Sequence, residues 1–324
     1  MRLTTLLCAA TTFLGSAPAI AEEPIEWLLK VSDAARDVSY QGVVVYRDGE
    51  RMDVMRIVHR NVNGRSQERL TSLNGQARDI LRDGDRVYFL AGDMPAQSAG
   101  ADPLFPVMSQ QLLTKATAHY DYRHLGESRV AGRVCRGVLM SPRDDYRYGY
   151  EICGDAGTGV PLRVSLIDRG GRTVEQLMFT EIAFPAKIAD SAFTPPPGVV
   201  APTVLAVPAA QQAVPETWRL ATLPPGFHVV RRDLAPAPDG VGVAERVLLS
   251  DGVSAVSVFG MQPVASARVL TGLFNLGAMS AYGRSIGAFH ITVIGDVPPD
   301  TVRMIGDGFA VPAEAAIQPA RLTD

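Results

Sequence analysis

The sequence SDGVSAVSVF, residues 250–259, begins the most regular stretch of this 324-residue chain, and GAMSAY (277–282) and HITVIGDVPPDTV (290–302) continue it. Asp251-Gly252 is a typical turn, and the residues after it alternate small polar with apolar side chains, as a half-buried strand does. The last piece predicts a strand over 290–294 and a helix that begins at Pro298-Pro299-Asp300. We therefore expect a small antiparallel sheet with one or two helices on one face.

Residues 40–90 contain short strands separated by tight turns, after a helix that the apolar stripe of Trp27, Leu28 and Val31 predicts over 26–37. The strands are predicted at 40–46, 51–60, 66–73, 77–81 and 86–90. The turns between them are Asp48-Gly49, Asn63-Gly64, Asn74-Gly75 and Asp83-Gly84. Because Asn-Gly and Asp-Gly between alternating runs are strong hairpin signals, we expect an antiparallel meander.

The same pattern continues to residue 184, with a helix predicted within 104–118. Further strands are predicted at 120–125, 130–140, 146–153, 162–168 and 173–184. A sheet of this length curls, and helices cover its concave side. The expected fold class is therefore α+β, with a large curved antiparallel half-barrel under helical cover and a small C-terminal antiparallel sheet with helices. A closed barrel or a sandwich would give a similar pattern.

A curled sheet can enclose an apolar cavity. Two alternating sets of side chains occupy the first two strands: Val44, Tyr46, Val54 and Val58 form one, and Val43, Val45, Met55 and Ile57 form the other. Either set can belong to the core. A lipid site would use the set that lines the concave face. We take the set of Val44, Tyr46, Val54 and Val58 as the candidate. Arg56, His59 and Arg69 are a candidate polar cluster, with a solvated strand face as the alternative.

Cys135 and Cys153 lie on either side of a turn at Arg143-Asp144-Asp145. A hairpin centred on Asp144 places the two cysteines directly opposite each other, where Cα atoms lie about 4.5–5.5 Å apart, within disulfide range. In an oxidising compartment this arrangement predicts a structural disulfide. A slip of the register by one residue would instead leave two free buried thiols.

The N-terminal residues predict export. Arg2 precedes an apolar run over 3–15, and Ala19-Ile20-Ala21 has the small-residue pattern of a signal peptide cleaved after Ala21. The alternative, a membrane anchor, is too short for a hydrocarbon layer of about 30 Å. Beyond a first domain at 22–194, the prolines of 195–216 predict a linker, followed by a second domain at 217–309 and a disordered tail at 310–324.

We expect neither enzymatic activity nor a cofactor. Gly283-Arg284-Ser285-Ile286-Gly287 has the spacing of a nucleophile elbow, but that motif joins a strand to a helix and needs an acid and then a histidine further on. Only His290 follows, so we interpret Ser285 as a turn residue. The other histidines, His59, His119, His124 and His228, lack metal-ligand spacing. The formal net charge of −3, or −4 once Arg2 is lost, excludes a basic stripe for nucleic acid.

Segments from both predicted domains resemble the MucB/RseB family, periplasmic regulators of an envelope-stress sigma factor. In residues 250–302 the resemblance covers the patterns S-D-G-x-x-A-x-S-V-F, G-A-x-x-x-Y and T-V-x-G-x-V-P-x-x-T-V. Nearer the N-terminus it covers Tyr40-Gln41-Gly42, Arg56-Ile57-Val58-His59, Glu68-Arg69-Leu70, Val130-Ala131-Gly132-Arg133, Pro142-Arg143-Asp144, Arg147-Tyr148 and Val174-Glu175-Gln176. The ordered spacing of these pieces is more specific than any single short motif.

The resemblance implies a LolA/LolB-like half-barrel and a soluble periplasmic negative regulator. Such a protein binds the periplasmic part of a membrane-spanning anti-sigma factor and protects it from site-1 proteolysis, until lipopolysaccharide or another acylated lipid releases it. The anti-sigma segment would dock around the second domain and the interdomain groove, with Phe259, Met261, Tyr282 and Arg284 as candidates. The alternative is a periplasmic lipid or lipoprotein carrier of LolA-like type, which needs only the half-barrel. A homo-oligomer also remains open.

Overall fold

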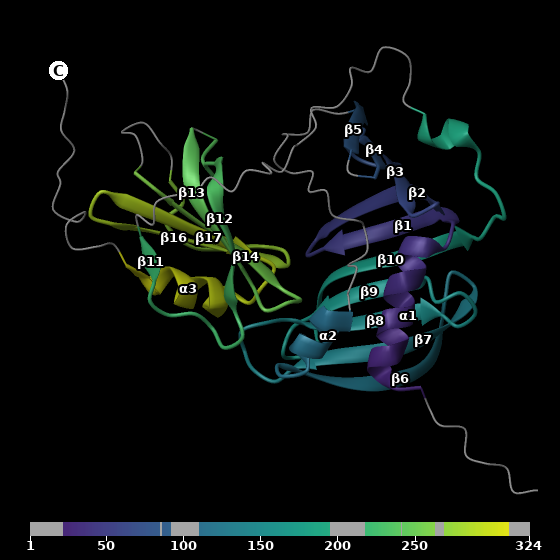
Figure 1. Cartoon of the computed structure of the whole chain (residues 1–324), viewed down its shortest axis with the longest axis horizontal. Coiled ribbons are helices and arrows are strands. Elements are labelled where there is room, and N and C mark those ends of the chain that lie inside the picture. Colours follow the sequence, from purple (N-terminus) through teal and green to yellow (C-terminus); the bar gives the residue numbers. More distant parts are fainter. Residues whose placement is uncertain are drawn as a thin grey trace, which may run out of the picture.

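The computed structural model describes residues 22–84, 86–91, 110–194, 218–240, 242–262 and 269–310. The predicted signal peptide, the proline-rich linker and residues 311–324 of the predicted tail lie outside these ranges. The described part of the chain forms two bodies side by side, each built on one antiparallel sheet (Figure 1). None of the helices in these ranges has the length and apolar character needed to cross a bilayer.

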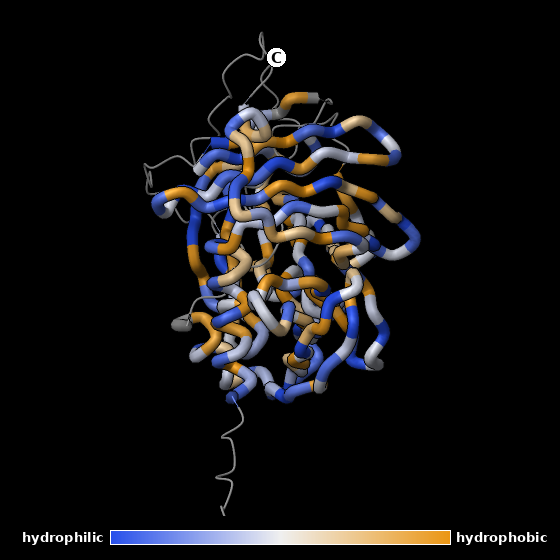
Figure 2. The backbone as a smooth tube through the Cα atoms, turned by 90° about the vertical axis from the view of Figure 1, so that its right-hand side faces the viewer, coloured by the Kyte–Doolittle hydropathy of each residue, from blue (hydrophilic) through white to orange (hydrophobic). Residues whose placement is uncertain are grey.

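The large sheet has ten strands in the order β5-β4-β3-β2-β1-β10-β9-β8-β7-β6, and every neighbouring pair is antiparallel. The strands are β1 (Tyr40–Asp48), β2 (Arg51–Val62), β3 (Arg65–Ser72), β4 (Asp79–Asp83), β5 (Arg86–Ala91), β6 (Tyr120–Val130), β7 (Arg133–Pro142), β8 (Gly149–Asp155), β9 (Pro161–Ile167) and β10 (Thr173–Ala183). Along the strands hydrophobic and hydrophilic residues alternate, while the peripheral loops are mainly hydrophilic (Figure 2). The predicted curved half-barrel is confirmed.

Helix α1 (Pro24–Asp37) covers one face of this sheet and crosses strands β10 to β7 (Figure 1). Its proline lies in the first turn, where the missing N–H would have no partner in the helix. Trp27 and Val31 are buried against Val138 and Ile152, and fully burying such side chains stabilises the fold by about 1.5–3 kcal/mol each. Helix α2 (Gln110–Ala116) extends the cover, and the short helix η1 (Asp190–Phe193) packs against Leu81.

The strand predicted over 130–140 is wrong at its start. In the structure β6 continues to Val130, and Ala131 and Gly132 form the turn into β7 with φ of 49° and 75°. This left-handed conformation is uncommon for alanine, and the pair lacks the Asn-Gly or Asp-Gly signal that marks the other turns. The hairpin of β6 and β7 was therefore missed, because the strand-like sequence pattern continues through its turn.

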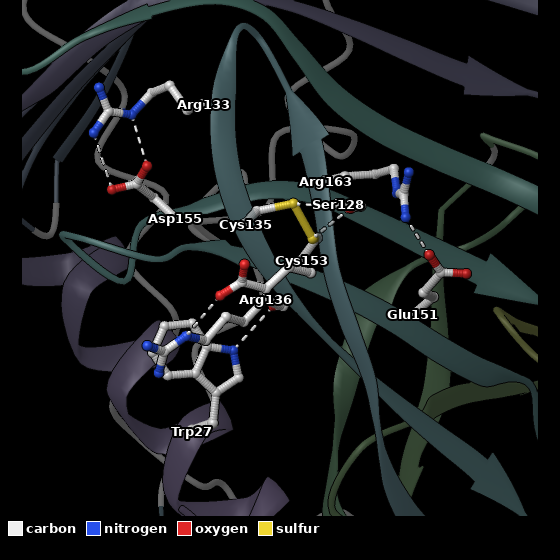
Figure 3. Close-up of a disulfide and its surroundings, with 10 residues drawn as sticks. Trp27, Ser128, Arg133, Cys135, Arg136, Glu151, Cys153, Asp155 and Arg163 are labelled. Carbon is white, nitrogen blue, oxygen red and sulfur yellow. Dashed lines mark hydrogen bonds and ion pairs between the residues drawn. A yellow bond between two sulfur atoms is a disulfide. The ribbon is translucent and has the colours of Figure 1, made fainter.

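Cys135 and Cys153 form the predicted disulfide, with their Cα atoms 5.5 Å apart (Figure 3). The predicted register is wrong, because Cys135 lies opposite Asp155 and Cys153 lies opposite Gly137. The bridge is therefore diagonal across β7 and β8. Both cysteines are fully buried, and the Ser128 hydroxyl lies 3.2 and 3.3 Å from their sulfurs. The hairpin is centred on position 145 of the 143–148 loop and not on Asp144, so each residue of β7 lies opposite a partner two positions beyond the predicted one.

The small sheet has six strands in the order β12-β13-β14-β17-β16-β15. Its strands are β12 (His228–Pro236), β13 (Val243–Ser250), β14 (Ala255–Met261), β15 (Gly272–Leu276), β16 (Met279–Ile286) and β17 (Phe289–Gly295). Helix α3 (Pro299–Asp307) begins at the predicted prolines and packs Val302 and Ile305 against Val258 and Val293. A two-stranded ribbon of β11 (Arg219–Leu220) and β18 (Phe309–Ala310) flanks it.

The disulfide makes a measurable contribution to stability. Replacing both Cys135 and Cys153 by alanine should lower the free energy of unfolding by about 3 kcal/mol, because the bridge closes a loop with a sequence separation of 18 residues. Urea unfolding of the oxidised proteins measures the difference. Ser128→Ala is the control, since it removes a neighbour of both sulfurs and leaves the bridge intact. Equal unfolding free energies for the double variant and the wild type would contradict this role.

Candidate functional site at the interface between the two sheets

The two bodies meet through loops at the ends of their strands. The large sheet contributes the loop at 143–148, between β7 and β8. The small domain contributes the loop at 225–227, the turn at 251–254, the turn at 277–278 and the start of α3. This interface is the candidate functional site, because it joins the parts whose relative position a ligand could change.

Arg147 lies at the centre of the interface, with a completely buried side chain. Its guanidinium donates from Nη1 to Asp251 Oδ2 at 2.7 Å, from Nε to Asp144 Oδ1 at 3.0 Å and from Nη2 to the carbonyl of Pro225. The same group lies 5.2 Å from the ring centre of Phe227, within cation–π range. One side chain of the large domain therefore contacts two loops of the small domain.

Asp251 is the anion that balances Arg147, and its side chain is also fully buried. Its second oxygen, Oδ1, accepts the N–H groups of Val253 at 2.9 Å and Ser254 at 2.7 Å, which fixes the turn between β13 and β14. The Tyr120 hydroxyl lies 3.5 Å from Oδ2, and burial together with the Asp251 charge raises the pKa of Tyr120 well above its ordinary value. Both oxygens of the buried carboxylate thus have donors.

Two further hydrogen bonds join the domains on either side of Arg147. Thr301 Oγ1, in the first turn of α3, donates to the carbonyl of Tyr146 at 2.9 Å. The N–H of Ala278 donates to Asp48 Oδ1 at 2.8 Å, and Ala278 packs with Tyr148 and Leu166. Val253 also packs against Ala116, Tyr120 and Met140, so the interface combines polar contacts with two small apolar clusters.

Many of the residues that make these contacts, though not Asp48, Tyr146 and Pro225, come from the segments that carried the family resemblance: Arg147-Tyr148, Ser250-Asp251-Gly252, Gly277-Ala278 and Thr301. Sequence reasoning identified the segments but missed the interface. Arg147 and Asp251 are 104 positions apart, and no local spacing rule connects residues at that separation. The available signal was the resemblance of two loops in different domains.

The four candidate anti-sigma contacts lie on two faces of the small sheet. Tyr282 and Arg284 lie on the face that packs against α3, and both contact Asp307 Oδ1 at 2.9 Å. Phe259 and Met261 point to the opposite face, and both are half-buried. The structure therefore places Phe259 and Met261 on one face and Tyr282 and Arg284 on the other, so the four residues do not form one site.

Near Met261 lies a groove of about 380 Å³, which Phe274, Ala281, Thr292 and Ile294 also line.

The candidate lipid-cavity residues also divide between two faces, so their interpretation as one set is wrong. The β1–β2 register pairs Val44 with Met55 and Val45 with Val54, so an even-numbered residue of β1 shares its face with an odd-numbered residue of β2. Val44 and Tyr46 face the α1 side, within or beside the main core. Val54 and Val58 face away, and Val58 packs against the cluster around η1.

The predicted polar cluster of Arg56, His59 and Arg69 does not form, because these side chains also divide between the two faces of the sheet. His59 is buried on the α1 side, stacks on Tyr40 and contacts the carbonyl of Arg36 through Nε2 at 3.0 Å. Burial lowers the pKa of His59. Arg56 is exposed on the other face, where Arg69 forms a bidentate pair with Asp79 at 2.9 and 2.7 Å.

Ser285 lies within β16 rather than in a turn, which corrects its interpretation as a turn residue. It pairs directly with His290 of β17, and the hydroxyl lies 3.0 Å from His290 Nδ1. Strand β17 follows β16 through a short turn, so the strand-to-helix geometry of a nucleophile elbow is not present here.

Removal of Arg147 should strongly destabilise the protein. Arg147→Met keeps most of the apolar stem but leaves Asp251 as an uncompensated buried charge, and breaking such a pair costs about 3–5 kcal/mol. Arg143→Met in the same loop is the matched control, because the Arg143–Asp121 pair is exposed to solvent and contributes little to stability. Urea unfolding compares the two variants.

Adding Asp251→Asn to Arg147→Met removes the unpaired charge and should recover part of the loss. Equal effects of the Arg147 and Arg143 substitutions would contradict a central role for the buried pair.

Comparisons with known proteins match the same family over both domains. The family model described as the MucB/RseB N-terminal domain matches residues 23–197, and the MucB/RseB C-terminal domain matches residues 212–310. The sigma factor AlgU regulatory protein MucB of Pseudomonas aeruginosa is 30% identical over an alignment of 324 positions, which covers 98% of this chain and 100% of that protein.

Solved structures agree with the family match. The complex of Pseudomonas aeruginosa MucA and MucB is 28% identical, with a TM-score of 0.71 over 90% of this chain and 99% of that one. A crystal structure of MucB is 27% identical, with a TM-score of 0.64 over 89% of this chain and 98% of that one. This chain belongs to the MucB/RseB family.

Proposed function

We propose that this protein is a periplasmic negative regulator of an envelope-stress sigma factor, exported with cleavage after Ala21. It binds the periplasmic part of a membrane-spanning anti-sigma factor and protects it from site-1 proteolysis. The observation that carries the proposal is the polar interface around Arg147, built from family-like segments of both domains. The relative MucB has been solved in complex with MucA, which supports the choice of partner.

The outer face of the small sheet supports docking of the anti-sigma segment better than the α3 face does. Phe259 and Met261 are accessible there, and Met261 lines the groove of about 380 Å³. On the α3 face, Tyr282 and Arg284 are already engaged with Asp307. Apolar side chains that enter a pocket dominate many protein interfaces. We therefore place the anti-sigma contact at Phe259 and Met261.

Release by lipopolysaccharide or another acylated lipid is the second part of the proposal. A pocket of about 110 Å³ opens on the α1 side of β2, β3 and β4, with Met55, Leu70 and Ile80 as its apolar lining and Arg78 at its polar part. This pocket can accept an apolar chain, and an acidic headgroup would compete with Asp53, which also lines the pocket and lies 3.9 Å from Arg78. If peptide and lipid prefer different arrangements of the two domains, each ligand must lower the affinity of the protein for the other ligand by the same factor.

The first experiment is a calorimetric titration of the mature chain, residues 22–324, with the periplasmic segment of the host's anti-sigma factor. We expect binding, and weaker binding when lipopolysaccharide is present. Uptake of acylated ligand without any peptide binding would overturn the regulator and leave a lipid or lipoprotein carrier.

Two substitutions on opposite faces test the docking site. Met261→Asp places a charge beside the groove and should weaken peptide binding by at least 30-fold, about 2 kcal/mol, the threshold of an interface hot spot. Tyr282→Phe removes only the hydroxyl that contacts Asp307 on the α3 face and should leave binding unchanged. The opposite ranking in the same titration would move the site to the α3 face.

Neighbouring residues of β2 test the lipid site. Met55→Gln changes the pocket lining and should reduce the effect of lipopolysaccharide on peptide binding, while the peptide affinity without lipid stays the same. Val54→Gln makes the same kind of change on the other face of the strand and serves as the control. A larger effect of Val54→Gln would place the lipid on the face that carries η1.

A further inference from the structure

Three carboxylates gather at one of the interdomain contacts. Asp48 at the end of β1 and Glu175 of β10 are direct cross-strand partners. Asp296, in the turn between β17 and α3 of the small domain, acts electrostatically on both. Like charges directly opposite each other in a sheet are destabilising, and here a third carboxylate from the other domain adds to them.

This carboxylate group is part of the contact between the domains. Asp48 Oδ1 accepts the N–H of Ala278 at 2.8 Å, so the tip of the β15–β16 turn rests on the end of β1. The approach is close enough to need glycine at position 277, which has φ of 72° and where an added Cβ would lie within van der Waals overlap of the Asp48 carboxylate. A change of charge beside Asp48 therefore acts on an interdomain hydrogen bond.

The described groups that face Glu175 supply no positive charge. From β1, Tyr46 shares a hydrogen bond with Glu175 and Asp48 lies opposite it; Tyr150 of β8 is electrostatically coupled to it. Its partner on β9 is the apolar Leu166. Burial first, and then the charges of Asp296 and Asp48, raise the pKa of Glu175 to about 7. Burial and Asp48 also raise the pKa of Asp296.

We infer that the contact between Asp48 and Ala278 is a pH-sensitive clasp, which protonation of Glu175 closes and ionisation of Glu175 loosens. The neutral carboxyl group leaves Asp48 and Asp296 as the carboxylates at the contact, whereas the ionised group adds a third. Arg51, the partner of Asp48 on β2, forms an ion pair with Asp53 at 2.7 Å. The clasp differs in kind from the contact at Arg147, which pairs opposite charges. Acidification of the surroundings therefore favours the closed arrangement of the domains.

The sign and range of the effect follow from linkage. An acid whose pKa is higher in the closed form gives a stabilisation that is complete below its pKa in the open form, about 4.3 for a solvated glutamate. That stabilisation is lost as the pH rises to about 7, the value in the closed form. The opening equilibrium of the clasp should increase with pH, by at most about tenfold per pH unit, and level off above pH 7.

Hydrogen exchange at the Ala278 amide tests this inference directly on the free, full-length mature protein, so its outcome does not depend on the proposed function. The protection of this amide, corrected for the chemical exchange rate, should fall between pH 5 and pH 7.5 by at least about tenfold. Val258 in the core of the same sheet is the internal reference for global unfolding and should keep its protection.

Three substitutions separate the clasp from a general effect of pH. Glu175→Gln keeps a hydrogen-bonding side chain but should abolish the pH dependence at Ala278. Asp296→Asn, in the other domain, removes one of the charges that raise the pKa of Glu175. It should therefore lower the pH above which the protection of the Ala278 amide stops falling. Glu181→Gln on the same strand is exposed and serves as the control. Unchanged protection of Ala278 in the wild type, or a Glu175→Gln variant that behaves like the wild type, would overturn the inference.

Discussion

The buried pair of Arg147 and Asp251 constrains the whole interface. Transfer of two charges out of water costs several kcal/mol per ion, and only close pairing with complete hydrogen bonding offsets that cost. The structure meets this condition through Asp144, the Pro225 carbonyl and the N–H groups of the 253–254 turn. Each of these partners must occupy one position, so the charged pair determines how three loops from two domains are placed.

Such an interface suits domains that move as units. Each body has its own core: α1 and the disulfide brace the large sheet, whereas α3 and Trp218 close the small one. Between them lie hydrogen bonds and two small apolar clusters, one around Ala278 and one around Val253. Interfaces between domains are commonly more polar than cores, and polar contacts can exchange with water when domains separate. A ligand that prefers one arrangement can therefore shift the equilibrium without unfolding either body.

Local chemistry explains which features the sequence predicted. Turns marked by Asn-Gly or Asp-Gly were placed correctly, and so was the helix opened by Pro298-Pro299, because these signals act within a few residues. The Ala131-Gly132 turn lacked such a signal, and strands β12 and β13 were not predicted. Register depends on loop geometry, and an error of one residue moves side chains to the other face. The grouping of Val44 with Val54 failed in this way.

The two kinds of interdomain contact also explain how one interface can be both specific and adjustable. The opposite charges of Arg147 and Asp251 define a unique fit, because any displacement leaves a buried ion without its partner. The carboxylates around Asp48 do the reverse, because their repulsion keeps the closed arrangement from being too stable. An interface held only by buried opposite charges would be rigid, and one made only of repelling carboxylates would not form. Their combination leaves the closed arrangement within reach of ligands whose binding contributes only a few kcal/mol, the range in which coupling between sites normally operates.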